Sequence, residues 1–386
     1  MSNEDVPLPI PNGKVPQNYF VLSNPRLSHI HNEARSALIK GIQDDEMAPY
    51  YMSLPPLTPP LLSQDDLNKL KDANTKALET LDAALSSAYD TEGESEISDA
   101  LRARANYLTK IGDKDKAVEA QKLALEKTPG LGARIDIVLT LVRIGFSFND
   151  QEIIRTYTKK AEALVEEGGD WDRRNRLKVY SGLQLVSVRQ FDRAATLFVD
   201  ALPTFTASEL LDYNDFVTLT VIAGTLVLKR PDLKKKIISS PEVNQVLPEI
   251  PALSDFTKSL YNCDYAKFFV SLAALEQTYL LPSRILSPHA RYYVREMRIL
   301  AYAQLLESYR SLTLQSMSTA FGVGVEFVDK DLQKFISSGR LNCTIDKVHG
   351  IVETNRPSSK NAQYETVVRQ GDLLLNSVQK LSKVLY

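Results

Sequence analysis

The sequence contains little cysteine, little histidine and no long hydrophobic segment. Only two cysteines, Cys263 and Cys343, occur among its 386 residues, which excludes a disulfide framework and a zinc site built from four thiolates. The longest hydrophobic run, residues 216–228, is shorter than the roughly 20 residues that a membrane-spanning helix needs. The first residues lack the basic and hydrophobic parts of a signal peptide. We therefore expect a soluble intracellular protein.

Catalytic sequence motifs are also missing. There is no phosphate-binding loop, no complete dinucleotide-binding glycine motif, no Gly-x-Ser-x-Gly and no His-Glu-x-x-His. Of the four histidines, only His29 and His31 have a spacing that suits a metal, and no aspartate follows at the distance that would complete a zinc site. The sequence thus predicts no catalytic residue, no cofactor, no metal ligand and no enzymatic activity.

The charges nearly cancel, since 46 Lys and Arg face 48 Asp and Glu. A net charge of −2 gives no support to bulk attraction toward nucleic acid or an anionic membrane. Residues 229–236 hold a local cluster of five cations, but no aromatic residues alternate with them as in single-strand nucleic-acid sites. We expect this cluster to be a solvated corner.

Prolines crowd the N-terminal part, where ten of the nineteen lie within the first sixty residues. A proline cannot continue a helix, and it biases the residue before it toward extended backbone. Residues 1–63 are therefore predicted to be an extended arm, with short helices near 32–43 and 46–53.

Helical periodicity begins after Ser63, which precedes Asp66 as in a helix start. Residues 64–189 are predicted to be helical repeats, with an acidic loop at 86–100. The repeat signal is the spacing of small residues, glycine and proline, which resembles a tetratricopeptide (TPR) unit and lets two antiparallel helices approach closely. One copy contains Gly112, Ala117, Ala124 and Pro129, a second contains Gly182, Leu185, Phe191, Ala194, Phe198 and Ala201, and a weaker one contains Ile154 and Ala161.

The pattern changes in the domain predicted over residues 190–356. Helical segments are expected at 207–228, 232–239, 254–261 and 265–279. From 291 to 356 the order becomes long helix, short helix, turn, helix and two strands, which is typical of a winged helix. The predicted pieces are helices at 292–309, 313–319 and 327–337 and strands at 340–346 and 349–354.

A winged helix can read DNA, but this one lacks the necessary cations. Its second helix carries Glu326, Asp329 and Asp331 against Lys330 and Lys334, and phosphate contacts need an excess of positive charge. The sequence therefore favours a protein-interaction module over a nucleic-acid reader.

The last segment, residues 357–386, is predicted to be one long helix with a heptad pattern. Two arrangements stay open: the helix folds back onto its own chain, or it packs into a bundle with helices of other chains. A glycine in the pattern would allow one close approach of backbones. The heptad residues, which we name the C-terminal seam, are Tyr364, Val367, Gly371, Leu374, Val378, Leu381 and Leu385, widened by Leu373, Leu375 and Val384.

Helical repeats, a winged helix and a terminal helix together resemble the PCI family, whose members occur in the proteasome lid, the COP9 signalosome and initiation-factor assemblies. The most specific stretch is 339–352, which is similar to the family pattern Gly-x-Leu-x-Ala-x-Ile-Asp-x-x-x-Gly-x-Val, with Cys343 at the alanine position. Tyr309, Leu314, Met317, Phe321 and Val328 also match. The residues assigned to the core and edge of the PCI winged helix are Leu332, Phe335, Ile336, Leu341, Ile345, Asp346 and Val352.

Over nearly its whole length, including residues 16–20 and 169–176, the chain is similar to PCI subunits of the 26S proteasome 19S regulatory-particle lid. This resemblance implies a mainly α fold, with a TPR-like solenoid, a PCI domain and a long C-terminal helix. It also implies a non-catalytic scaffold in a cytoplasmic and nuclear hetero-oligomer that supports ubiquitin-dependent proteolysis. The implied partners are other PCI lid subunits, the lid deubiquitinase subunits and the ATPase ring, with no nucleic acid and no membrane. The alternatives are a COP9 signalosome subunit of the subunit 1 type and a PCI-type nucleic-acid-binding adaptor.

Overall fold

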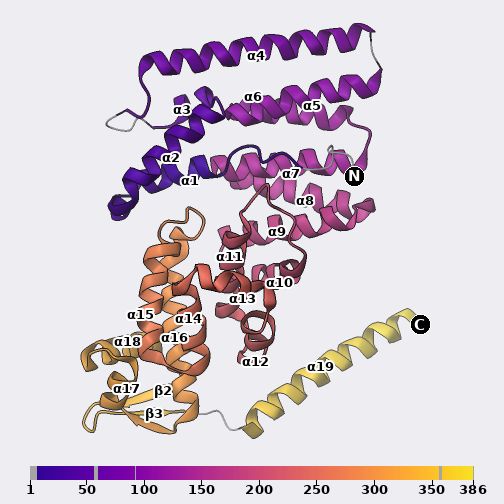
Figure 1. Cartoon of the computed structure of the whole chain (residues 1–386). Helices are drawn as coiled ribbons and strands as arrows, with labels where there is room; N and C mark the ends of the chain where they lie inside the picture. Colours follow the sequence, from indigo (N-terminus) through magenta and orange to yellow (C-terminus); the bar gives the residue numbers. More distant parts are fainter. Residues whose placement is uncertain (1–6, 56–59, 92, 356–358, 386) are drawn as a thin grey trace. The chain divides into compact units, whose positions relative to one another are not determined.

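The computed structural model describes residues 7–55, 60–91, 93–355 and 359–385, and Figure 1 shows its helices and strands. The chain forms two compact units. The first comprises Met1–Tyr261 with Val270–Val294, and the second comprises Asn262–Phe269 with Arg295–Tyr386. Most of the described residues are helical, so the predicted mainly α class is confirmed. None of the described helices is long and apolar enough to cross a membrane.

The N-terminal region is more helical than the prolines suggest. Helices α2 (His31–Asp44) and α3 (Ala48–Ser53) lie near the predicted positions. The prediction of an extended arm was wrong for α1 (Lys14–Ser23). Pro16 is the third residue of that helix, and a proline is tolerated in the first turn because N–H groups there have no partner within the helix.

Helix α4 (Gln64–Thr91) begins as predicted, because the Ser63 hydroxyl accepts a hydrogen bond from the Asp66 N–H at 3.2 Å. The predicted loop at 86–100 was mostly wrong, since α4 continues to Thr91 and α5 starts at Glu94. Acidic residues in the first turn of a helix interact favourably with its dipole, so the same glutamates that suggested a loop suit a helix start.

Three antiparallel helix pairs follow, as the small-residue spacing predicts (Figure 1). Gly112 ends the first helix of one pair in the left-handed region at φ 76°. Gly182 lies within a helix, where a Cβ would meet the Phe198 ring at 2.4 Å, so the glycine allows close packing. The pairs are α5 (Glu94–Ile111) with α6 (Lys114–Lys127), α7 (Leu131–Phe148) with α8 (Gln151–Gly168), and α9 (Trp171–Ser187) with α10 (Phe191–Ala201).

The remaining helices of the first unit are shorter and less regular. The helix predicted from residue 207 starts only at Tyr213, after the cap residue Asp212. The basic cluster at 229–236 is exposed, as expected for a solvated corner. These helices are α11 (Tyr213–Val227), α12 (Arg230–Leu233), α13 (Pro241–Val246) and α14 (Pro251–Asn262).

The second unit contains the predicted winged helix, with one strand that the sequence did not predict. Strand β1 has three residues, too few to show a period of two. The strands form an antiparallel sheet in the order β1-β3-β2. Helices α15 (Tyr265–Leu275) and α16 (Ala290–Ser308) run through both units. The other elements are β1 (Ser311–Thr313), α17 (Leu314–Phe321), α18 (Val325–Ser337), β2 (Cys343–Asp346), β3 (Ile351–Thr354) and the terminal α19 (Ser359–Leu385).

Candidate protein-interaction surfaces

Aromatic side chains form the centre of the second unit. Tyr302 of α16 lies 4.6 Å from Phe321 and 6.2 Å from Phe335, measured between ring centroids. Aromatic pairs at such distances add to the stabilisation from burial. The inner face of α18 is thereby held against α16. Of the residues assigned to the core or edge, Leu332, Phe335, Leu341 and Val352 are buried, Ile336 and Ile345 are half-buried, and Asp346 is exposed.

An ion pair joins α18 to α16. Asp331 is only 5% exposed, and its carboxylate accepts a hydrogen bond from Arg298 at 2.7 Å. Burial raises the pKa of Asp331, and the positive charge of Arg298 opposes that rise. Asp331 therefore does not belong to the outer face of α18.

The outer face of α18 has balanced charges. Glu326 is paired with Lys330 at 3.9 Å. Asp329 is paired at 3.5 Å with Lys347 of the wing, which is the hairpin formed by β2 and β3. Since Asp331 points inward, the outer face carries two of the three acids that the sequence places on this helix. The preference for a protein-interaction module is unchanged, because the two acids still offset the lysines and leave little excess of cations for phosphates.

Strand β2 forms one edge of the sheet. Its register pairs Ile345 with Val352, and the Asn355 N–H donates to the Asn342 carbonyl at 2.9 Å. Because hydrogen-bonded and non-hydrogen-bonded pairs alternate in an antiparallel ladder, the N–H and C=O groups of Cys343 and Ile345 point away from β3. A strand edge of this kind is a template for a strand of another chain.

Asp346 organises the turn at the tip of the wing. One carboxylate oxygen accepts hydrogen bonds from the N–H groups of Val348 and His349, and the other lies 2.6 Å from Nδ1 of His349. The hydrogen bond from His349 is the main reason that the pKa of Asp346 lies below its usual value. The turn presents Val348, which is 88% exposed.

Helix α19 leaves its apolar side chains in solvent within this single chain. The described seam side chains Tyr364, Val367, Leu374, Val378 and Leu381 are between 61% and 71% exposed. A Cβ built at Gly371 would meet no atom within 4 Å. Leu385 and Val384 lie outside the residues whose side chains are described. The adjacent Leu373 and Leu375 are similarly exposed.

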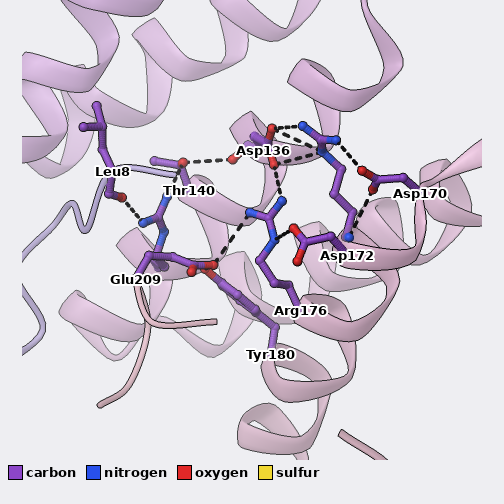
Figure 2. Close-up of polar contacts among 10 residues, drawn as sticks. Leu8, Asp136, Thr140, Asp170, Asp172, Arg176, Tyr180 and Glu209 are labelled. Carbon is purple, nitrogen blue, oxygen red and sulfur yellow. Dashed lines mark hydrogen bonds and ion pairs between the residues drawn. The ribbon is translucent and has the colours of Figure 1, made fainter. Parts of the chain in front are cut away.

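A buried charge network organises the first unit (Figure 2). Asp136 of α7 accepts hydrogen bonds from Arg173 at 2.6 Å and lies 3.3 Å from Arg176, both on α9. Arg176 is only 2% exposed and also lies 3.9 Å from Glu209, which accepts a hydrogen bond from Tyr180 at 3.0 Å. Burial raises the pKa of Tyr180. The network joins α7, α9 and the loop before α11.

The same network reaches the N-terminal segment. Arg143 of α7 is 5% exposed and donates to the Leu8 carbonyl and to the Thr140 hydroxyl. Arg173 and Arg176 belong to the stretch 169–176 that the family resemblance marks in the sequence, whereas no sequence signal marks Asp136, Arg143 or Glu209. No local motif marks these three residues, because the contacts that tie them to other segments reach at least 29 residues along the chain.

The cysteine, histidine and glycine residues that the sequence offered as candidates for catalysis or ligand binding have purely structural surroundings. Cys343 is buried, which raises the pKa of its thiol, and His31 lies 3.0 Å from the Asn24 carbonyl. Gly322 ends α17 at φ 65°, in keeping with a turn. Within the described ranges, no group of three or more His, Cys, Asp and Glu side chains is arranged to hold a metal ion.

Three family models match successive parts of the chain. The model described as 26S proteasome subunit RPN7 matches residues 64–236, and the PCI domain model matches residues 272–356. A third, described as the C-terminal helix of the 26S proteasome regulatory subunit RPN7/PSMD6, matches residues 363–385. These matches cover the repeats, the winged helix and α19 in turn.

Similar proteins match over nearly the full length. The chain is 42% identical to the 26S proteasome non-ATPase regulatory subunit 6 homolog of Arabidopsis thaliana, over 95% of each chain. It is 44% identical to the 26S proteasome non-ATPase regulatory subunit 6 of Dictyostelium discoideum, over 92% of each chain. With COP9 signalosome complex subunit 1 of Arabidopsis thaliana, identity falls to 25% over 51% of this chain and 45% of that protein.

Proposed function

The chain belongs to the RPN7 family of 26S proteasome regulatory subunits, and from this premise we propose that it is a non-catalytic scaffold of the regulatory-particle lid. The sequence resemblance, which extends to non-ATPase regulatory subunit 6 in particular, is confirmed by these relatives. The COP9 alternative is weaker, because its similarity is lower and covers about half of the chain. The observation that supports a scaffold role most directly is the exposed apolar stripe of α19.

The stripe on α19 requires a protein partner. At 27 residues the helix is about 40 Å long, at 1.5 Å per residue. With about 100° between successive residues, the apolar side chains from Leu381 through Tyr364 to Val368 span an arc of roughly 140°, and Leu373 lies about 80° beyond Leu381. An a/d seam of a two-stranded coiled coil is narrower. We therefore assign α19 to a bundle in which it contacts at least two helices of other lid subunits.

The edge of β2 supports a second mode of assembly. The outward N–H and C=O groups of the half-buried Ile345 suit the addition of a strand from a neighbouring PCI domain, whereas Cys343 beside it is buried. The described winged helix presents no excess of cations, which disfavours the nucleic-acid adaptor. A gel shift with DNA or RNA should show no salt-sensitive complex at micromolar protein.

We also propose the partners, the location and the role in proteolysis that the family resemblance implies. A lid scaffold contacts the deubiquitinase subunits and the ATPase ring, works in the cytoplasm and the nucleus, and supports ubiquitin-dependent proteolysis. Its lack of catalytic activity is supported by the absence of catalytic motifs in the sequence.

The test replaces two seam leucines of α19. Leu374→Asp and Leu381→Asp together place two carboxylates on the apolar stripe, so we expect at least tenfold less of the chain to co-purify with lid subunits identified by mass. The matched control, Asn376→Asp with Gln379→Asp, places two carboxylates on the polar side of the same helix. It should assemble normally.

Both variants should remain soluble and helical as isolated chains, because α19 has no buried described side chain in the single chain. Normal assembly of the leucine variant, or equal loss in the control, would contradict the scaffold proposal.

A further inference from the structure

The segment of residues 281–293, which we name the latch segment, connects distant parts of the first unit. It follows α15 and contains the start of α16. Its residues contact α1, the end of α7 and the turn between α9 and α10. These contacts are distinct from the β2 edge and the α19 stripe.

The first contact joins the latch segment to α1. The Gln17 side-chain amide donates to the Pro282 carbonyl at 2.5 Å and accepts from the Arg284 N–H at 3.0 Å. One side chain thus satisfies two main-chain groups that lie more than 260 residues further along the chain. Leu281 also packs against the small cluster around Leu27.

The second contact lies at the carboxyl end of α7. The guanidinium of Arg284 donates to the carbonyl of Ser147 at 2.9 Å and to the carbonyl of Phe146. The last carbonyls of a helix have no partners within the helix, and a cation there is favoured by the helix dipole. Burial lowers the pKa of Arg284.

The third contact lies at the turn between α9 and α10. Nε of Arg189 donates to Nδ1 of His289 at 3.2 Å, and Nε2 of His289 lies 3.0 Å from the Ser187 carbonyl. A guanidinium only donates and a carbonyl only accepts, so His289 carries its hydrogen on Nε2. Arg189, at φ 66°, also lies over the Tyr292 ring at 5.1 Å, and Phe191 stacks on that ring.

We propose that the latch segment couples the N-terminal helices to the first turn of α16, so that release of one loosens the other. The three contacts depend on the side chains of Gln17, Arg284 and His289. Each contact joins segments that are at least 100 residues apart in the chain. Such contacts form or break together, because ordering the loop for one of them also places the others. Coupling of this kind is reciprocal.

The test is amide hydrogen exchange on the full chain. Arg284→Met keeps the length of the side chain but removes its donors, and we expect exchange in α1 to rise at least tenfold. Gln17→Leu removes the amide, and exchange in residues 287–293, which lie beyond the groups that Gln17 contacts, should rise by a similar factor. The matched control is Arg291→Met on the exposed side of α16, which should change neither segment.

A merely local role would give a different result. Faster exchange confined to the altered segment, with the distant one unchanged, would overturn the proposal, as would no change in either. If Arg284→Met does not fold, Arg284→Lys replaces it. The lysine keeps the positive charge but cannot donate to both the Ser147 and Phe146 carbonyls in the same way, so amide exchange in α1 should rise by less than tenfold. The double variant should accelerate exchange no more than the stronger single variant, whereas independent contacts would multiply their effects.

Discussion

At the scale of single residues, the buried charge of Arg176 is balanced by acids from its own helix, from α7 and from the loop before α11. Arg176 is almost fully buried, and Asp136, Asp172 and Glu209 balance the positive charge of its guanidinium. Leaving such a charge without a partner costs about 3–5 kcal/mol. Arrangements of α7, α9 and the loop before α11 that separate these charges are therefore strongly disfavoured. The intact network adds little to the net free energy of unfolding.

Asp150 gives a residue-scale prediction about pH. It caps α8 by accepting hydrogen bonds from the N–H groups of Glu152 and Ile153, and it pairs with Lys114 at 2.8 Å. The hydrogen bond from Lys114, followed by the backbone bonds, lowers its pKa below 3.8. Its stabilising contribution is therefore present above about pH 3.8 and is lost as the pH falls through the lowered folded-state value.

We expect Asp150→Ala to lower the free energy of unfolding by about 1 kcal/mol at neutral pH. The difference from the unaltered chain should shrink as the pH approaches 3, because protonation removes the same interactions. Urea unfolding at several pH values measures this. The control Asp150→Asn keeps a cap acceptor and should differ less from the unaltered chain at neutral pH, and a pH-independent difference for the alanine variant would contradict the assignment.

At the scale of elements, α19 and β2 are both left without a partner within the described chain, but in different ways. For α19 the unpartnered groups are side chains, and the sequence predicted them because heptad spacing is local. For β2 they are backbone groups, and their direction follows only from the pairing with β3. The sequence therefore predicted where a strand lies and could not predict which of its residues face outward.

The direction of the backbone in β2 gives an element-scale prediction. Ile345→Pro removes an N–H that points away from the sheet, so the fold should persist while association with a neighbouring PCI domain weakens at least tenfold. Thr344→Pro is the matched control, because its N–H points toward β3 and its loss should destabilise the winged helix itself.

Thermal unfolding and co-purification with lid subunits separate the two outcomes. Normal association of the Ile345 variant would exclude strand addition at this edge. Equal stability of both variants would show that the assigned alternation along β2 is wrong.

At the scale of the whole molecule, the two units are interleaved along the chain. Residues 270–294 return to the first unit after the chain has entered the second. The domain boundaries expected from the sequence, at residues 63, 189 and 356, follow changes in local pattern. The return of residues 270–294 to the first unit depends instead on contacts such as that of Gln17 with Pro282. The composition of the sequence does not change at residues 270 or 294, so nothing local marks this return.

This interleaving predicts how fragments behave. A fragment of residues 1–261 lacks the latch segment, whereas a fragment of residues 1–294 retains it. We expect the shorter fragment to melt at least about 5 °C lower, which corresponds to roughly 2 kcal/mol for a chain of this size. Thermal unfolding followed by circular dichroism measures the difference, and equal melting temperatures would show that residues 270–294 do not complete the first unit.

The sequence by itself determined the kinds of element and their order: helix pairs, a winged helix and a long apolar-striped terminal helix. These follow from periodicity, caps and glycine positions, all of which act between residues close in the chain. The tertiary structure alone decided that Asp331 turns inward to Arg298, that Asp136 balances two arginines, and that Gln17 holds the loop before α16. Each of these contacts joins residues more than 30 positions apart, so only the packing of whole helices brings the charges and hydrogen-bonding groups together.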